Sequence, residues 1–343
     1  MRAPLTEGFS AEPPKGIVVV ALNDAHAPRS READSGARCT LRGGESRRDE
    51  AVAVHEVRIK SGGATLVGSY SRAGSTAIVA VHGAGEGTRD WYLYQHLHDV
   101  LPPAGIGVLT FDRRGEGASA GNPSRGAFDV QADDALAFAN AIDADRVGLW
   151  GISQGSWVAP LAAARSKRIA FLVLLASTGV TPAAQMRYAV AEQIRGAGFG
   201  AEAAARAVAL REQAERWARG EEVRGLDGEL AVAARGPWWN LAYLPDGLPP
   251  EDEADSARRA IAEEMFFEPE PVFAQVRIPT LLFYGDDDSW TPVEPSIEAW
   301  RRARGDQVEI VVLAETGHEP RLPSGSISAE YERKLTDWAR ARV

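Results

Sequence analysis

Ser153 lies in the pattern Gly151-Ile152-Ser153-Gln154-Gly155, which follows an apolar run and precedes an alanine-rich stretch that favours a helix. A serine at a sharp strand-to-helix turn has a strained backbone, and glycine two positions to either side removes the Cβ atoms that would collide there. The helix that begins at such a turn directs its free N–H groups and the positive end of its dipole toward the serine oxygen. The pattern therefore predicts a nucleophilic serine.

A nucleophilic serine needs a base, and the base needs a third group to orient it. Of the 6 histidines, His82 and His318 each follow an apolar, strand-like run. Sites in open α/β sheets form at the carboxyl ends of such strands. We expect His318, which follows the last of these runs, to be the base.

Three consecutive carboxylates, Asp286, Asp287 and Asp288, follow Gly285 at the end of the strand-like run 280–284. Adjacent carboxylates repel one another, so at least one of them is expected to have a function. We favour Asp288 as the orienting acid, with Asp287 as the alternative. The order along the chain is then Ser, Asp, His.

Backbone N–H groups are expected to hold the oxyanion that forms when the serine attacks a carbonyl. The first predicted donor is the N–H of Gln154, directly after the nucleophile. The second is expected in the loop His82-Gly83-Ala84-Gly85 that follows another strand-like run, with Ala84 preferred and Gly83 as the alternative.

These residues need a sheet to bring them together, and the chain alternates between strand-like and helix-like segments. Residues 52–59 and 64–70 flank Gly62-Gly63 and predict an antiparallel hairpin. Continuous apolar runs, typical of strands buried on both faces, lie at 76–81, 106–111, 146–151, 169–175, 280–284 and 308–313. Helices are expected near 91–101, 128–142, 158–164, 294–304 and 329–341. This alternation predicts an α/β fold with a doubly wound, mostly parallel sheet.

The segment 178–275 interrupts the alternation and is interpreted as an inserted helical cap. One amphipathic helix is expected where Ala203, Ala207, Leu210, Ala214 and Trp217 recur at helical spacing. A solvated turn is expected at 251–253, a run of three acidic residues. The aromatic residues of the insertion are predicted to contact an apolar substrate, although packing within the cap explains each of them equally well: Trp217, Trp238, Trp239, Phe266 and Phe267. The expected organisation is an N-terminal extension (1–50), a core (51–177 and 276–343) and the cap.

The composition limits the partners. The chain has 343 residues, a net charge of -10 and a single cysteine, Cys39. The acidic charge argues against nucleic acid or an anionic membrane as a partner. One cysteine allows no intrachain disulfide and no cysteine-based zinc site, and no apolar run approaches the length of a membrane span. We expect a cytoplasmic protein without a cofactor or metal, whose partners are a small acyl substrate and at most a second copy of the chain.

Taken together, the motifs resemble those of the α/β-hydrolase fold superfamily over about residues 52–343. The resemblance rests on the loop at 82–85, the turn Asp112-Arg113-Arg114-Gly115-Glu116-Gly117-Ala118-Ser119, the serine motif, Gly285 to Pro292, and Gly317-His318, which stand in the family's order. The stretch after Ser153 is similar to bacterial esterases and to serine-aminopeptidase-like and dienelactone-hydrolase-like proteins. In that pattern the acid stands three residues after the glycine and four before the proline, which implies Asp288. Ser156 departs from the pattern, because many relatives have glycine there.

The function that these residues and the resemblance imply is hydrolysis of a carboxylic ester or thioester through an acyl-enzyme on Ser153. The same triad could instead serve an acyltransferase, a cyclising thioesterase, a peptidase or a C–C bond hydrolase. A third alternative is a non-catalytic binding protein that has kept the fold, since fold alone does not establish activity.

Overall fold

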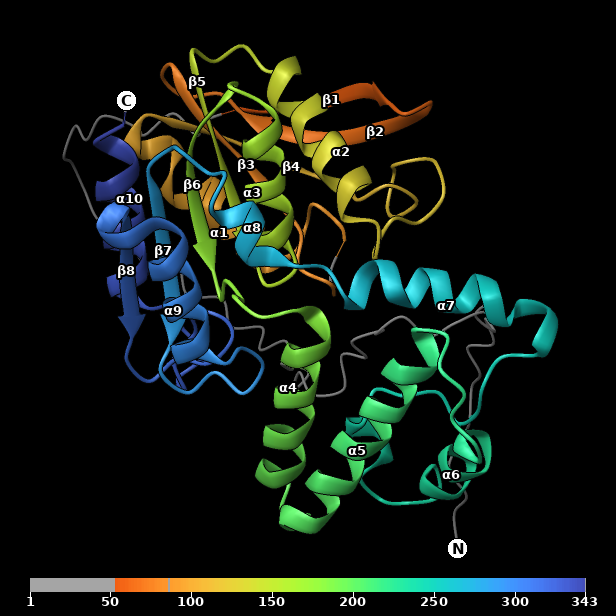
Figure 1. Ribbon diagram of the computed structural model, residues 1–343. Coiled ribbons are helices and arrows are strands. Elements are labelled where there is room, and N and C mark those ends of the chain that lie inside the picture. The colour runs from red at the N-terminus through yellow and green to blue at the C-terminus, as the bar shows by residue number, and fades with distance from the viewer. Residues whose placement is uncertain (1–52, 86, 343) are drawn as a thin grey trace, which may run out of the picture.

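The computed structural model describes residues 53–85 and 87–342. The expectations about the N-terminal extension, including Cys39, fall outside these residues. Within them, eight strands form one sheet in the order β1-β2-β4-β3-β5-β6-β7-β8 (Figure 1). The strands are β1 (Val54–Ser61), β2 (Ala64–Ser71), β3 (Thr76–Val81), β4 (Ile106–Phe111), β5 (Arg146–Ile152), β6 (Ile169–Leu175), β7 (Thr280–Gly285) and β8 (Val308–Leu313).

The sheet is mostly parallel, as predicted. β1 and β2 form the expected antiparallel hairpin, and β2 pairs antiparallel with β4. All other neighbouring strands run parallel. The three strands β3, β4 and β7 are buried along their whole length, which explains why their sequences are continuously apolar instead of alternating.

Helices cover both faces of the sheet. On one face, α2 (Phe128–Ala141), α3 (Gly155–Arg165), the short α8 (Pro269–Phe273) and α9 (Val293–Arg304) contribute to one hydrophobic cluster. On the other face, α1 (Tyr92–Val100) and α10 (Ala329–Arg340) contribute to a second. Single 3-10 turns lie at Pro102–Ala104, Trp239–Leu241 and Gly305–Gln307. This three-layer arrangement is the predicted doubly wound fold.

The segment between β6 and β7 is helical, and its first four helices gather beyond one end of the sheet (Figure 1). They are α4 (Pro182–Gly196), α5 (Gly200–Ala218), α6 (Leu226–Ala233) and α7 (Glu251–Met265). We call these four helices and the residues that join them the cap. The cap has a hydrophobic cluster of its own. The amphipathic helix expected around Ala203 to Trp217 is α5, and the other three were not anticipated.

The acidic run at 251–253 does not form a solvated turn, so that expectation is wrong. Glu251, Asp252 and Glu253 are exposed, as expected, but they form the first turn of α7. Negative charges interact favourably with the positive end of a helix dipole. Three consecutive acidic residues after Pro250 are therefore a helix start and not a break.

Candidate active site

Ser153 lies directly after β5, and its backbone is strained as the glycine pattern predicts. Its φ is 53°, and Ser153 is one of a few non-glycine residues with positive φ in the described chain. A Cβ on Gly151 would lie 2.5 Å from the carbonyl oxygen of Gly155, and a Cβ on Gly155 would lie 2.5 Å from that of Val81. Gly151 is therefore needed for the tightness of the turn itself, and Gly155 for the close approach of the turn to β3. Such strain at a serine is typical of a functional site.

Ser156, the departure from the family pattern, fits into the turn without exposure to solvent. Its side chain is fully buried, and its hydroxyl donates a hydrogen bond to the backbone carbonyl oxygen of Ser153 at 2.6 Å. The backbone N–H of Ser156 donates to the same oxygen at 2.8 Å. The extra hydroxyl therefore adds a contact that holds the nucleophile's own peptide group.

His318 and Asp288 come together after β8 and β7. The Nδ1 atom of His318 lies 3.1 and 3.0 Å from the two carboxylate oxygens of Asp288. The Asp288 side chain is completely buried, whereas 21% of the His318 side chain is exposed. Oδ1 of Asp288 also accepts hydrogen bonds from the N–H groups of Trp290 (2.7 Å) and Thr291 (2.9 Å). The carboxylate is therefore held in place, and its contact with Nδ1 directs the Nε2 lone pair of His318 outward.

The environment of the pair lowers the pKa of Asp288 and raises the pKa of His318. Burial would raise the pKa of Asp288, but the neighbouring His318 and the two backbone N–H groups hold it below its ordinary value. Burial would lower the pKa of His318, but the charge and hydrogen bond of Asp288 hold it above its ordinary value. The arrangement stabilises an imidazolium beside a carboxylate, which is what a base that has taken a proton from serine requires.

The three predicted residues follow the carboxyl ends of parallel strands, so they share one edge of the sheet. The N–H of Ser153 donates to Leu175 at the end of β6, and Ala176 accepts from the hydroxyl of Thr291 at 3.5 Å. That hydroxyl lies 3.4 Å from Nδ1 of His318. Among the described residues, the Ser153 hydroxyl itself makes no direct hydrogen bond to His318. Catalytic hydrogen bonds are often long without substrate and shorten in the reacting complex.

The alternatives to His318 and Asp288 have different surroundings. His82 is buried, its Nε2 lies 2.6 Å from the carbonyl oxygen of Phe111, and burial lowers its pKa to about 3. Asp287 is exposed, and its backbone N–H donates a hydrogen bond to the carbonyl oxygen of Thr316 at 3.0 Å. His82 therefore belongs to the core of the sheet, and Asp287 faces solvent.

The two predicted oxyanion donors lack competing acceptors. Among the residues that the structure describes, no acceptor is found for the N–H of Gln154 or that of Ala84. The Gln154 side chain is buried, and its amide oxygen accepts from Gln131 Nε2 at 3.1 Å. A Cβ built on Gly83 would lie 3.7 Å from Cβ of Ser153, so the loop that carries Ala84 packs against the nucleophile. That the two N–H groups donate to an oxyanion stays a prediction.

The five aromatic residues predicted to contact substrate lie in two places. Trp217 and Trp238 are buried in the cap cluster, and Trp239 and Phe266 pack against it. Phe267 packs instead against the hydrophobic cluster of the core, with its ring 5.1 Å from that of Phe128 on α2 and 6.4 Å from that of Trp157 on α3. Of the five, Trp217 also lines a cavity of the cap. Their packing roles are therefore visible, and contact with substrate stays a prediction.

Two residues of the site were not anticipated from the sequence. The ring of Trp290 lies 6.1 Å from that of His318, and the hydroxyl of Tyr188 on α4 donates to the backbone carbonyl oxygen of Asp288 at 3.0 Å. Trp290 could have been noticed, because it stands two residues after the predicted acid. Nothing in the sequence around Tyr188 indicates that it meets a residue 100 positions away.

Residues 53–85 and 87–342 contain no group of three or more His, Cys, Asp or Glu side chains placed to hold a metal ion. None of their helices combines the length and the apolar character that crossing a bilayer demands.

The chain belongs to the alpha/beta hydrolase family, whose profile its sequence matches over residues 78–326. The match spans the strained serine and the histidine–aspartate pair. No curated protein matches the sequence.

Solved structures with the same fold include several hydrolases. An esterase from Pyrococcus furiosus superposes with a TM-score of 0.56 at 17% identity, covering 88% of this chain and 95% of the esterase. Est1E from Butyrivibrio proteoclasticus, solved with ferulic acid, superposes with a TM-score of 0.51 at 19% identity, covering 83% of this chain and 97% of the Est1E chain. A membrane phospholipase A described as a bacterial virulence factor superposes with a TM-score of 0.51 at 22% identity, covering 84% of this chain and 88% of the phospholipase. At these identities the likeness establishes the fold.

Proposed function

We propose that the protein is a serine hydrolase that cleaves carboxylic esters or thioesters, with Ser153 as nucleophile, His318 as base and Asp288 as orienting acid. The observation that carries the proposal is the strained Ser153 at the same sheet edge as a buried carboxylate bonded to His318 Nδ1. Strain is rarely kept at a serine without a function. The esterases among the solved structures with this fold are consistent with this chemistry.

In the proposed reaction, His318 Nε2 accepts the Ser153 hydroxyl proton as the serine oxygen attacks the substrate carbonyl. The N–H groups of Gln154 and Ala84 donate to the resulting oxyanion, and each such donor typically contributes about 3–4 kcal/mol. The imidazolium then returns its proton to the leaving alcohol or thiol, and an acyl-enzyme remains on Ser153. A water molecule, activated by His318, releases the acid and restores the serine.

The test compares Ser153→Ala with Ser156→Ala, a matched removal of a hydroxyl three residues away. We expect Ser153→Ala to lose turnover of p-nitrophenyl acetate and labelling by a fluorophosphonate, while Ser156→Ala remains labelled. Labelling of Ser153→Ala at the wild-type level would refute the assignment. Product analysis with competing alcohols and amines then separates hydrolysis from acyl transfer, and acyl-thioesters and aminoacyl-anilides define the bond cleaved.

A further inference from the structure

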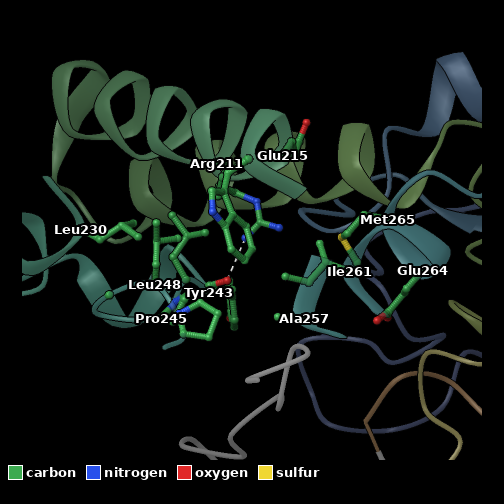
Figure 2. A pocket seen from close by; sticks show the side chains of 15 residues that line it. Arg211, Glu215, Leu230, Tyr243, Pro245, Leu248, Ala257, Ile261, Glu264 and Met265 are labelled. Carbon is green, nitrogen blue, oxygen red and sulfur yellow. Dashed lines mark hydrogen bonds between the residues drawn. The ribbon is translucent and has the colours of Figure 1, made fainter. Parts of the chain in front are cut away.

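The cap contains a cavity of about 220 Å³ between α5, α7 and the segment 243–249 (Figure 2). Its walls are mainly apolar, and they include Trp217, Leu230, Leu244, Leu248, Ile261 and Met265. An apolar protein cavity of roughly 150 Å³ already holds a benzene ring. This cavity is therefore large enough for a medium-length aliphatic chain or a single aromatic ring.

One cation, Arg211, reaches into this apolar space. The residue is 5% exposed, and its Nη1 donates to the carbonyl oxygens of Ala242 and Tyr243, both at 2.9 Å. Its Nη2 donates to no residue that the structure describes, and Figure 2 shows the guanidinium in the middle of the pocket. Burial lowers the pKa of Arg211 to about 10, so the group keeps its charge at neutral pH.

The two carboxyl groups at the rim do not occupy the cavity. Glu215 forms an ion pair with Arg187, and its carboxyl group points away from the pocket (Figure 2). The carboxyl group of Glu264 also points outward, toward Gly126, where a Cβ would lie 2.7 Å from its oxygen. Arg211 is therefore the polar group that a molecule in the cavity would meet.

Two aromatic rings lie between the wall of the cavity and His318. Tyr243 lines the cavity, and its ring lies 5.3 Å from that of Trp290. The ring of Trp290 in turn lies 6.1 Å from His318. The cavity is therefore two ring contacts away from His318.

We infer that this cavity binds the acyl part of the substrate, and that the preferred acyl group carries an oxygen at its far end that accepts a hydrogen bond from Arg211. The inference rests on the proposed function and narrows it to esters of medium-chain acids with a terminal oxygen, such as a carboxylate. A purely apolar chain fills the same space but offers no acceptor to Arg211 Nη2 and would shield it from water, and a donor left unpaired in this way is costly.

The experiment measures kcat/KM for p-nitrophenyl acetate, for p-nitrophenyl octanoate, and for mono-p-nitrophenyl suberate, which has the same chain length with a terminal carboxylate. We expect the wild-type protein to prefer suberate to octanoate by about tenfold or more, since hydrogen bonds to charged groups are the stronger ones. Arg211→Met is expected to remove that preference, and Arg211→Lys to keep part of it.

Ala257→Leu, which fills the cavity from α7, is expected to lower the ratio of kcat/KM for octanoate to kcat/KM for acetate at least tenfold. The exposed Ala260→Leu on the same helix is expected to leave this ratio unchanged.

Each failure has its own signature. If the wild-type protein turns over none of the esters and Ser153 is not labelled, the proposed function itself fails. If acetate is hydrolysed but Ala257→Leu and Ala260→Leu give the same ratio, the cavity does not hold the acyl chain. If the cavity variants behave as expected but suberate is not preferred, or Arg211→Met keeps the preference, the assignment of Arg211 is wrong.

A second, independent observation concerns the loop that carries Ala84. Arg113, whose side chain is 1% exposed, donates through Nη2 to the carbonyl oxygen of Gly83, and its backbone N–H donates to Gly87 at 2.6 Å. Because the peptide between Gly83 and Ala84 is planar and trans, the Ala84 N–H points opposite to that carbonyl. A donor fixed on the oxygen therefore fixes the direction of the N–H.

Arg113 is itself held in place. Its Nη1 donates to Glu116 at 2.9 Å, and Arg125 donates to both carboxylate oxygens of Glu116, at 2.9 and 3.1 Å. The Glu116 carboxylate occupies the space that a side chain at Gly87 would fill. We infer that Arg113 is a positioning residue, which orients and polarises the Gly83–Ala84 peptide so that Ala84 N–H donates to the oxyanion.

The matched control is the next residue, Arg114, which is also buried but pairs with Asp134 and Ser61 and makes no hydrogen bond to the 83–87 loop within the described chain. We expect Arg113→Met to lower kcat for p-nitrophenyl acetate about 10–100-fold with little change in KM, because the lost interaction belongs to the transition state. Affinity for a trifluoromethyl ketone, which forms a tetrahedral adduct, should fall by a similar factor. Arg113→Lys is expected to retain more activity than Arg113→Met.

Arg114→Met is expected to lower Tm but not kcat, measured at a temperature at which both variants are folded. An unchanged kcat in a folded Arg113→Met would overturn the role of Arg113. So would a loss of kcat in Arg114→Met as large as in Arg113→Met, because the effect would then be a general consequence of losing a buried arginine. If Arg113→Met does not fold, Arg113→Lys decides the question through the same kcat and ketone measurements.

Discussion

The hydroxyl of Tyr188 donates a hydrogen bond to the backbone carbonyl oxygen of Asp288 at 3.0 Å, and so joins the first cap helix to the residue that orients His318. A second contact of the same kind lies beside it, where Gln185 on α4 donates to the carbonyl oxygen of Trp290 at 2.9 Å. The cap therefore supports the loop that follows β7. Changes in the cap are expected to affect the His318–Asp288 pair through these two contacts.

Replacing Tyr188 by Phe removes the hydroxyl and leaves the Asp288 carbonyl oxygen without this partner. We expect a loss of about 1 kcal/mol in the free energy of unfolding, together with a fall in kcat of less than tenfold. Tyr331→Phe is the control, since it removes a hydroxyl that accepts from Trp150 at 3.0 Å on the far face of the sheet. Equal kcat losses in the two variants would show that Tyr188 has no special link to the site.

Replacing Asp288 by Asn tests the choice between adjacent acids. The Asn oxygen can keep the hydrogen bonds from Trp290 and Thr291, but its NH₂ group then faces His318 Nδ1 and favours the wrong tautomer. We expect kcat to fall by about 10⁴-fold, as in other serine triads. Asp287→Asn alters an exposed carboxylate and is expected to keep wild-type kcat. The reverse result would identify Asp287 as the acid.

The pH profile of kcat/KM reports the base of the free enzyme. Burial lowers the pKa of His318 and Asp288 raises it, with a net pKa above the ordinary value of 6.5. Since the base must be unprotonated, activity is expected to rise with pH and to level off only above pH 6.5. In Asp288→Asn, burial remains while the carboxylate charge is gone, so the midpoint of the residual activity should move to lower pH. A midpoint that does not move would show that the group whose titration is observed is not His318.

Glu264, at the rim of the cap cavity, makes stability depend on pH. Burial raises its pKa from 4.5 to about 7, against the opposing effect of Arg113 and Arg211. The folded protein thus binds this proton more tightly than the unfolded chain, and the stability contributed by the protonated group is lost as the pH rises from about 4.5 through 7. We expect Glu264→Gln to raise Tm more at pH 8 than at pH 5. The exposed neighbour Glu263→Gln should show no such difference, and an equal shift at both pH values would contradict the account.

The strands and the core helices could be predicted because their signals are local. A run such as 76–81 is apolar throughout, and it forms a strand buried on both faces. The cap was predicted less well. We predict an apolar stripe only for α5. Helix α7 also has one, formed by Ala254, Ala257, Ile261 and Met265, but it begins with three acidic residues that also suit a turn. Whether such a run starts a helix depends on what the rest of that helix packs against, here the cap cluster.

The sequence alone determined the family, the strained turn at Ser153 and the order of the candidate catalytic residues, because glycine spacing and apolar periodicity act over a few neighbouring positions. The tertiary structure added the physical difference between Asp288 and Asp287 and between His318 and His82, since their burial and hydrogen-bond partners come from segments far apart in the chain. The same holds for Tyr188, Arg211 and Arg113. Each donates a hydrogen bond to a backbone carbonyl oxygen that comes within reach only after the sheet and the cap have formed.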